Sequence, residues 1–126
     1  MKAKIYDLTP KISPRLAVFP GDQAFSRQVA MSFKGGNHLE LSSISTTVHL
    51  GAHADAPSHY HPDGMTMEKR SPARYVGPAQ VVRVRGIGPK GLVMPGTMRV
   101  EVRPPRILVD SGSFRDPDKW NPDFSA

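Results

Sequence analysis

Residues 49–61 read HLGAHADAPSHYH, and this stretch decides the local fold. His49 and His53 are four positions apart, a spacing that on a helix places both side chains on one face. Gly51, Pro57 and the β-branched residues just before the stretch disfavour a helix. On extended backbone, the histidines and the aspartate of the stretch all fall on odd positions and project from one side. The sequence therefore predicts an extended segment with one polar side.

The same stretch carries four of the five histidines of the chain, together with Asp55. Neutral imidazole and carboxylate are ordinary ligands of zinc and its divalent neighbours. A straight strand separates His49 from His53 by about 13 Å, whereas both rings must come within about 2.1 Å of a shared ion. We therefore expect a bend at Gly51-Ala52, where the missing Cβ of Gly51 permits it. His53 and Asp55, about 6.6 Å apart on a strand, reach one ion without a bend.

A catalytic zinc needs three protein ligands and one open position for water. His49, His53 and Asp55 supply this minimum, and His59 is a candidate general base or proton shuttle just outside the ligand set. The pattern indicates metal-assisted hydrolysis of an amide or ester. The alternative is that the histidines are ordinary surface residues, as a single isolated histidine usually is.

Composition limits the class of protein. The chain has 126 residues, with 13 prolines, 11 glycines and no cysteine. This length fits a single domain over residues 1–126, and so many helix breakers disfavour a helical bundle. The lack of cysteine excludes disulfides, thiolate zinc sites and a cysteine nucleophile. No apolar run approaches the ~20 residues that cross a bilayer, so we expect a cytoplasmic protein without a membrane partner.

The net charge of +6 raises the question of nucleic acid. The basic residues are spread along the chain, with no cluster beyond Lys69-Arg70 and Arg83/Arg85. Aromatic and basic residues do not alternate as they do on an RNA-binding sheet. No nucleic-acid partner is therefore expected, although a basic nucleic-acid-binding β domain stays open as an alternative.

The rest of the chain predicts strands separated by proline- and glycine-rich loops. Residues 106–110 contain a continuous apolar run, Ile107–Val109, that ends in polar residues, which is typical of a buried strand. A short helix is expected around residues 66–75, although Pro72 weakens it. The remaining strands are expected within residues 4–9, 23–33, 39–50 and 77–84.

The segment His49–His59 resembles the H-x-G-T-H-x-D-A-P-x-H motif of the cyclase family, the family of the bacterial kynurenine formamidases (arylformamidases). Further segments are similar to family motifs in the same order along the chain. They are Tyr6–Thr9, Phe19–Asp22 (FPGD against W-P-G-D), Pro72–Pro78 (against L-x-x-Y-x-G-P) and Ser113–Asn121.

The resemblance implies a swivelling β/β/α fold of the α/β (α+β) class, rich in strands. It implies that His49, His53 and Asp55 bind one or two Zn²⁺ ions, with Mn²⁺ a possible substitute, and that His59 is the catalytic base. Phe19 falls where the family's aromatic residue lines the substrate pocket. The implied reaction is hydrolysis of N-formyl-L-kynurenine to L-kynurenine and formate, a step of tryptophan catabolism. Family members are usually dimers or larger.

Three differences from the family pattern bear on these expectations. Ala52 replaces the usual threonine of the motif, and Phe19 replaces tryptophan. Family members are also longer, and their C-terminal part brings a histidine and a glutamate that complete a two-metal site. We therefore expect an N-terminal portion of such an enzyme that forms a homodimer or pairs with a partner supplying the other half. The alternative is a metal-binding remnant without turnover that acts as an assembly module.

Overall fold

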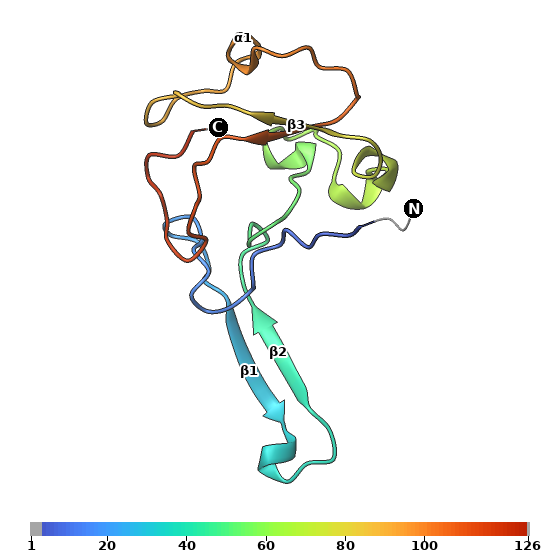
Figure 1. The fold of residues 1–126 in the computed structure, drawn as a ribbon. Helices are drawn as coiled ribbons and strands as arrows, with labels where there is room; N and C mark the ends of the chain where they lie inside the picture. The colour runs from blue at the N-terminus through green and yellow to red at the C-terminus, as the bar shows by residue number, and fades with distance from the viewer. Residues whose placement is uncertain (1–3, 126) are drawn as a thin grey trace. The chain divides into compact units, whose positions relative to one another are not determined.

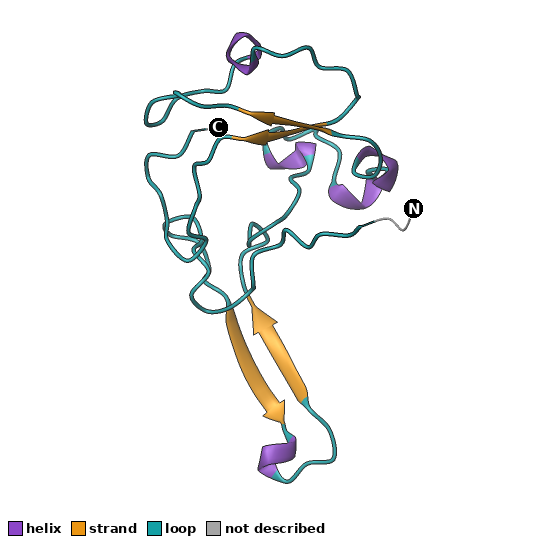
Figure 2. Cartoon of the chain, viewed as in Figure 1, coloured by secondary structure: helices purple, strands orange, loops and turns teal. Residues whose placement is uncertain are grey.

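The computed structural model describes residues 4–125, which combine short strands with short helices (Figures 1 and 2). The predicted α+β class is confirmed. In chain order the elements are β1 (Ser26–Met31), the 3-10 helix η1 (Phe33–Gly35), β2 (Leu41–Ser45), the 3-10 helices η2 (Pro57–His59), η3 (Met67–Lys69) and η4 (Pro72–Arg74), β3 (Gln80–Arg83), α1 (Pro95–Met98) and β4 (Ile107–Asp110).

The described residues divide into two compact units. Unit 1 contains residues 4–54 and 116–120, and unit 2 contains residues 55–115 and 121–125. The expectation of a single domain stays a prediction. None of the helices among the described residues has the length and apolar character needed to span a bilayer.

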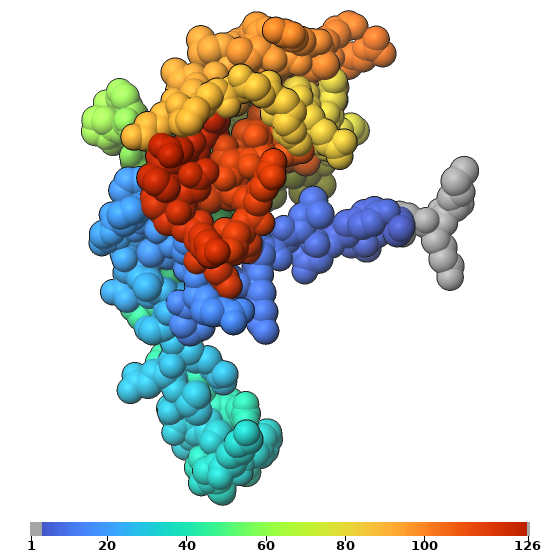
Figure 3. Space-filling model, turned by 60° about the vertical axis from the view of Figure 1, so that its left-hand side comes forward, coloured from blue at the N-terminus to red at the C-terminus, as the bar shows by residue number. Residues whose placement is uncertain are grey.

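Unit 1 contains an antiparallel hairpin of β1 and β2. Its register pairs Ser26 with Ser45, and an irregularity between Val29 and Met31 shifts the pairing near the turn. Every residue of both strands is exposed, and Figure 3 shows the visible face of the hairpin uncovered by other segments. The hairpin confirms strands within 23–33 and 39–50.

Unit 2 contains a parallel pair, β3 and β4, in which Gln80 lies opposite Ile107. Val82, in β3, and Val84, directly after β3, are buried, with 2% and 3% of their surface exposed. The prediction that residues 106–110 are buried is wrong, because Leu108 keeps 56% of its surface exposed. A strand with a continuous apolar run is buried only where other elements cover both faces of its sheet. The sheet of β3 and β4 has two strands, so β4 is an edge strand.

Two further expectations need correction. Residues 4–9 form no strand, and the Thr9 N–H instead donates to Asp7 Oδ1 at 2.9 Å. The helix expected over residues 66–75 is divided into η3 and η4. Pro72 lacks an N–H and begins η4, so it cannot continue the preceding turn.

Candidate metal-binding site

Hydrogen bonds fix the backbone that leads into the histidine segment. The Thr47 N–H donates to the Gln23 carbonyl at 2.9 Å, and the Thr47 hydroxyl donates to Asp22 Oδ2 at 3.2 Å. The same hydroxyl oxygen accepts from the His49 N–H at 3.2 Å. Thr47 therefore connects the turn that ends at Asp22 to the backbone of His49.

The bend predicted at Gly51-Ala52 is confirmed. Gly51 has a φ of 57°, in the left-handed region that favours glycine. Leu50, at 9% exposure, and Leu16, at 5%, belong to the small core of unit 1. A Cβ on Gly51 would lie 3.2 Å from Leu16 Cδ2, so the bend also needs a small residue. Burial of Leu50 and the turn at Gly51 together bring His53 back toward His49.

The two imidazoles meet directly. His49 Nδ1 lies 3.2 Å from His53 Nε2, and the rings are 72° from coplanar. His53 Nδ1 lies 2.9 Å from the Gly51 carbonyl oxygen, which can only accept, so this nitrogen carries the proton. His53 Nε2 therefore holds a lone pair that faces His49.

This geometry fits a shared divalent ion. Two nitrogens bound tetrahedrally at about 2.0–2.1 Å from zinc lie about 3.3 Å apart. The 3.2 Å between His49 Nδ1 and His53 Nε2, a hydrogen-bond distance between the two rings, is close to that separation. The bond from His53 to the Gly51 carbonyl is the kind of outer contact that orients a metal-bound histidine. The donor set, imidazole with a carboxylate nearby, suits zinc or manganese.

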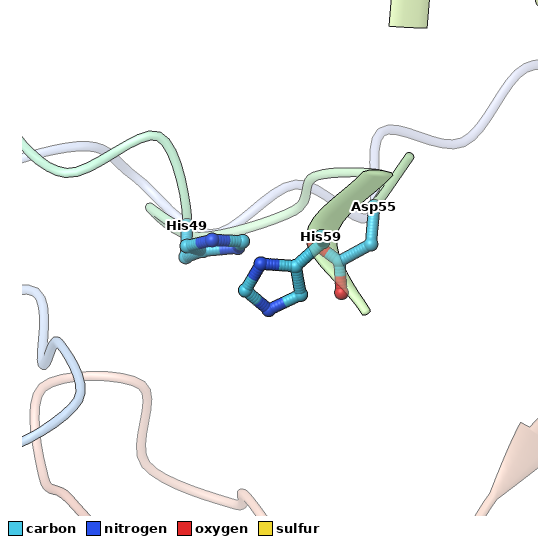
Figure 4. Close-up of side chains that lie close together, drawn as sticks. All are labelled: His49, Asp55 and His59. Atoms are coloured by element: carbon cyan, nitrogen blue, oxygen red, sulfur yellow. The ribbon is translucent and has the colours of Figure 1, made fainter. Parts of the chain in front are cut away.

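Asp55 and His59 lie in unit 2, on the continuation of the histidine segment, and Figure 4 draws their side chains together with that of His49. His59 ends η2, whose first residue is Pro57. The Tyr60 hydroxyl donates a long 3.5 Å bond to Asp55 Oδ2. Within unit 1 the structure brings His49 and His53 together, and the assignment of Asp55 as a ligand and of His59 as the base stays a prediction.

Phe19 lies in unit 1, in a turn closed by the Asp22 N–H, which donates to the Phe19 carbonyl at 2.9 Å. Its side chain is 59% exposed. Its ring meets the Trp120 ring edge to face, with centroids 5.2 Å apart. Its predicted role in substrate binding stays a prediction.

The sequence model of the family described as "Putative cyclase" matches residues 6–105, which include the whole histidine segment. The chain belongs to the cyclase family. It is also similar to curated relatives named kynurenine formamidase, with 33% identity to that of Delftia acidovorans, 35% to that of Maricaulis maris and 32% to that of Bordetella petrii. These alignments cover 98–100% of this chain but 59–60% of each relative.

Sequence reasoning within the cyclase family motifs missed the contacts of three residues of unit 1: Asp22 and Thr47, which lead to the backbone of His49, and Trp120, which meets Phe19. In the sequence, Asp22 is the last residue of the FPGD segment, Thr47 is one of the β-branched residues before the histidine segment, and Trp120 is part of the segment Ser113–Asn121. The position of Asp22 at the end of the FPGD segment was the one available signal, since a carboxylate beside a turn often accepts a hydrogen bond. Nothing local to Thr47 or Trp120 indicates a partner so distant in sequence.

Proposed function

We propose that this chain provides the metal-binding portion of a hydrolase that converts N-formyl-L-kynurenine to L-kynurenine and formate. Two findings support the proposal: membership of the cyclase family and similarity to relatives named kynurenine formamidase. The observation that carries it is the 3.2 Å separation of His49 Nδ1 and His53 Nε2. That separation is what two ligands of one zinc ion require.

In this proposal His49, His53 and Asp55 hold Zn²⁺, with Mn²⁺ as a substitute and room for one or two ions. When bound, the ion acidifies water and polarises the formyl carbonyl. The Gly51 carbonyl keeps the proton of His53 on Nδ1, so that Nε2 can offer its lone pair to the ion. Thr47 holds the His49 backbone, and Tyr60 steadies the Asp55 carboxylate.

His59 is proposed as the general base. It takes a proton from water as the water oxygen bonds to the formyl carbon, and it returns the proton to the departing aniline nitrogen as the C–N bond breaks. Formate and a free aromatic amine result.

The test separates the role of a base from that of a ligand. Wild-type protein loaded with zinc should release L-kynurenine from N-formyl-L-kynurenine, measured by absorbance. His59→Ala should keep its zinc, measured by metal analysis, and lose about 10²–10⁴-fold in kcat. His38→Ala, outside the cluster, is the control and should match wild type. Zinc uptake without any turnover in the wild type would instead support a metal-binding module without catalysis.

We also propose a homodimer, or pairing with a second polypeptide. The chain spans about 60% of the length of the curated relatives that it matches. Several apolar side chains of the hairpin are exposed in unit 1, and exposed apolar surface and open strand edges favour association. They include Val29 at 51%, Leu41 at 54% and Ile44 at 66%. Analytical ultracentrifugation should show a dimer, and a monomer at all concentrations would contradict this part of the proposal.

A further inference from the structure

Two aromatic rings form a corner on unit 1. The Phe19 and Trp120 rings lie 5.2 Å apart between centroids and 78° from coplanar. Phe19 is 59% exposed, so the contact with Trp120 leaves this residue accessible to solvent. Trp120 is the only tryptophan of the chain. We refer to these two side chains as the aromatic corner.

Backbone contacts hold the aromatic corner in place. The Ala17 N–H donates to the Pro117 carbonyl at 3.0 Å, which joins residues 15–19 to residues 116–120. Arg15 Nε and Asp118 Oδ2 lie 3.1 Å apart, although both are accessible to water and this ion pair adds little stability. The segment that carries Trp120 is therefore fixed against the segment that carries Phe19.

The aromatic corner is also connected to the histidines of unit 1. The turn that begins at Phe19 ends at Asp22, which accepts the Thr47 hydroxyl, and Thr47 accepts the His49 N–H. Leu16, three positions before Phe19, lies under the bend at Gly51. The segment that carries Phe19 is thus joined to the histidine segment by two sets of contacts. The hydrogen bonds of Thr47 reach the backbone of His49, and the apolar contact of Leu16 reaches Gly51.

We propose that Trp120 is a specificity-determining residue, which binds the aromatic ring of the substrate together with Phe19. This inference rests on the proposed function, with Phe19 contacting the substrate as predicted, and it adds Trp120 as the second ring of that contact. Two rings near a right angle offer a planar ligand one face for stacking and one edge for a T-shaped contact, and aromatic rings prefer both arrangements. A planar aryl group that carries the scissile amide is the class of substrate that fits. An aliphatic formamide would gain neither contact.

Binding can be followed through Trp120 itself, because its fluorescence has no competing tryptophan. The probe is L-kynurenine, the proposed product, titrated into the full chain. We expect saturable quenching, with a Kd about five- to tenfold higher in Phe19→Leu. Phe114→Leu is the matched control, since Phe114 pairs with Phe124 in unit 2, with centroids 5.6 Å apart. Its Kd should equal that of the wild type.

A kinetic arm separates this inference from the proposed function. Trp120→Leu should raise KM for N-formyl-L-kynurenine about five- to tenfold and leave kcat within about twofold, and Trp120→Phe should restore most of the loss. Turnover without quenching, and with an unchanged KM in Trp120→Leu, would overturn the inference while the proposed function stands. Saturable quenching that Phe19→Leu weakens, without turnover, would support the inference and count against the proposed function.

Discussion

Thr47 Oγ1 lies 3.2 Å from Asp22 Oδ2 and joins two segments that are 25 positions apart in sequence. The hydroxyl donates to the carboxylate, while its oxygen accepts from the His49 N–H. One side chain thus determines where the histidine segment begins. Outer contacts of this kind orient metal-binding residues, and they do so without touching the ion.

Replacing Thr47 with valine keeps the shape of the side chain and removes both hydrogen bonds. The Asp22 carboxylate and the His49 N–H would each lose a partner, so the backbone at His49 would gain freedom. We expect zinc affinity to fall about tenfold, which is typical for loss of an outer contact. Competition with a chromogenic chelator measures this directly. Unchanged affinity would show that Thr47 does not position His49.

The neighbouring residue supplies the control. Thr46 Oγ1 is buried and has no hydrogen-bond partner among the described residues. Because an unpaired buried hydroxyl costs about 1–3 kcal/mol, Thr46→Val should stabilise the fold or leave it unchanged. Zinc affinity should stay at the wild-type value. Thermal unfolding, measured on each single variant, compares the stability of Thr46→Val with that of Thr47→Val. The comparison separates the general effect of a valine at this part of the chain from the loss of the Asp22 contact.

Gly64 allows the chain to pass close to η2, which carries His59. A Cβ at this position would lie 2.4 Å from the carbonyl carbon and oxygen of Pro57. Because backbone atoms cannot move aside cheaply, Gly64→Ala should destabilise the protein by about 1–3 kcal/mol and displace η2. Chemical denaturation measures the loss. Gly88→Ala is the control, since a Cβ at Gly88 meets nothing within 4 Å. Equal stability of the two variants would contradict the close approach.

Asp110 should titrate below its ordinary pKa. The hydrogen bond from Arg85 Nη2, at 2.8 Å, lowers the pKa of this carboxyl from 3.8, and the charges of Arg85 and Arg83 lower it further. The Asp110 carboxyl therefore binds its proton less tightly in the folded state than in the unfolded state. The resulting stabilisation is complete above the unfolded pKa of about 4 and is lost as pH falls through the folded pKa.

Carbon-detected NMR of the Asp110 carboxyl measures this titration. The midpoint should lie below 3.8, and Arg85→Met should move it back toward that value. A midpoint at or above 3.8 in the wild type would show that the Arg85 contact does not persist in solution.

The sequence was informative where neighbours along the chain decide the conformation. Ligand spacing and a glycine predicted the bend between His49 and His53. One helix was expected over residues 66–75, and Pro72, expected only to weaken it, begins the separate helix η4. Burial of β4 was predicted wrongly, because it depends on what covers a strand rather than on the strand's own residues. The contacts of Thr47 with Asp22 and of Phe19 with Trp120 join distant segments, and no local pattern encodes them.

Zinc binding to His53→Ala tests the central claim most directly. Isothermal titration of metal-free wild type should show a zinc site, and His53→Ala should bind zinc at least about 100-fold more weakly, since losing a ligand costs more than losing an outer contact. His38→Ala should bind zinc as the wild type does. If His53→Ala kept wild-type affinity, the 3.2 Å approach of His49 Nδ1 and His53 Nε2 would be an ordinary hydrogen bond, and the shared metal site would be refuted.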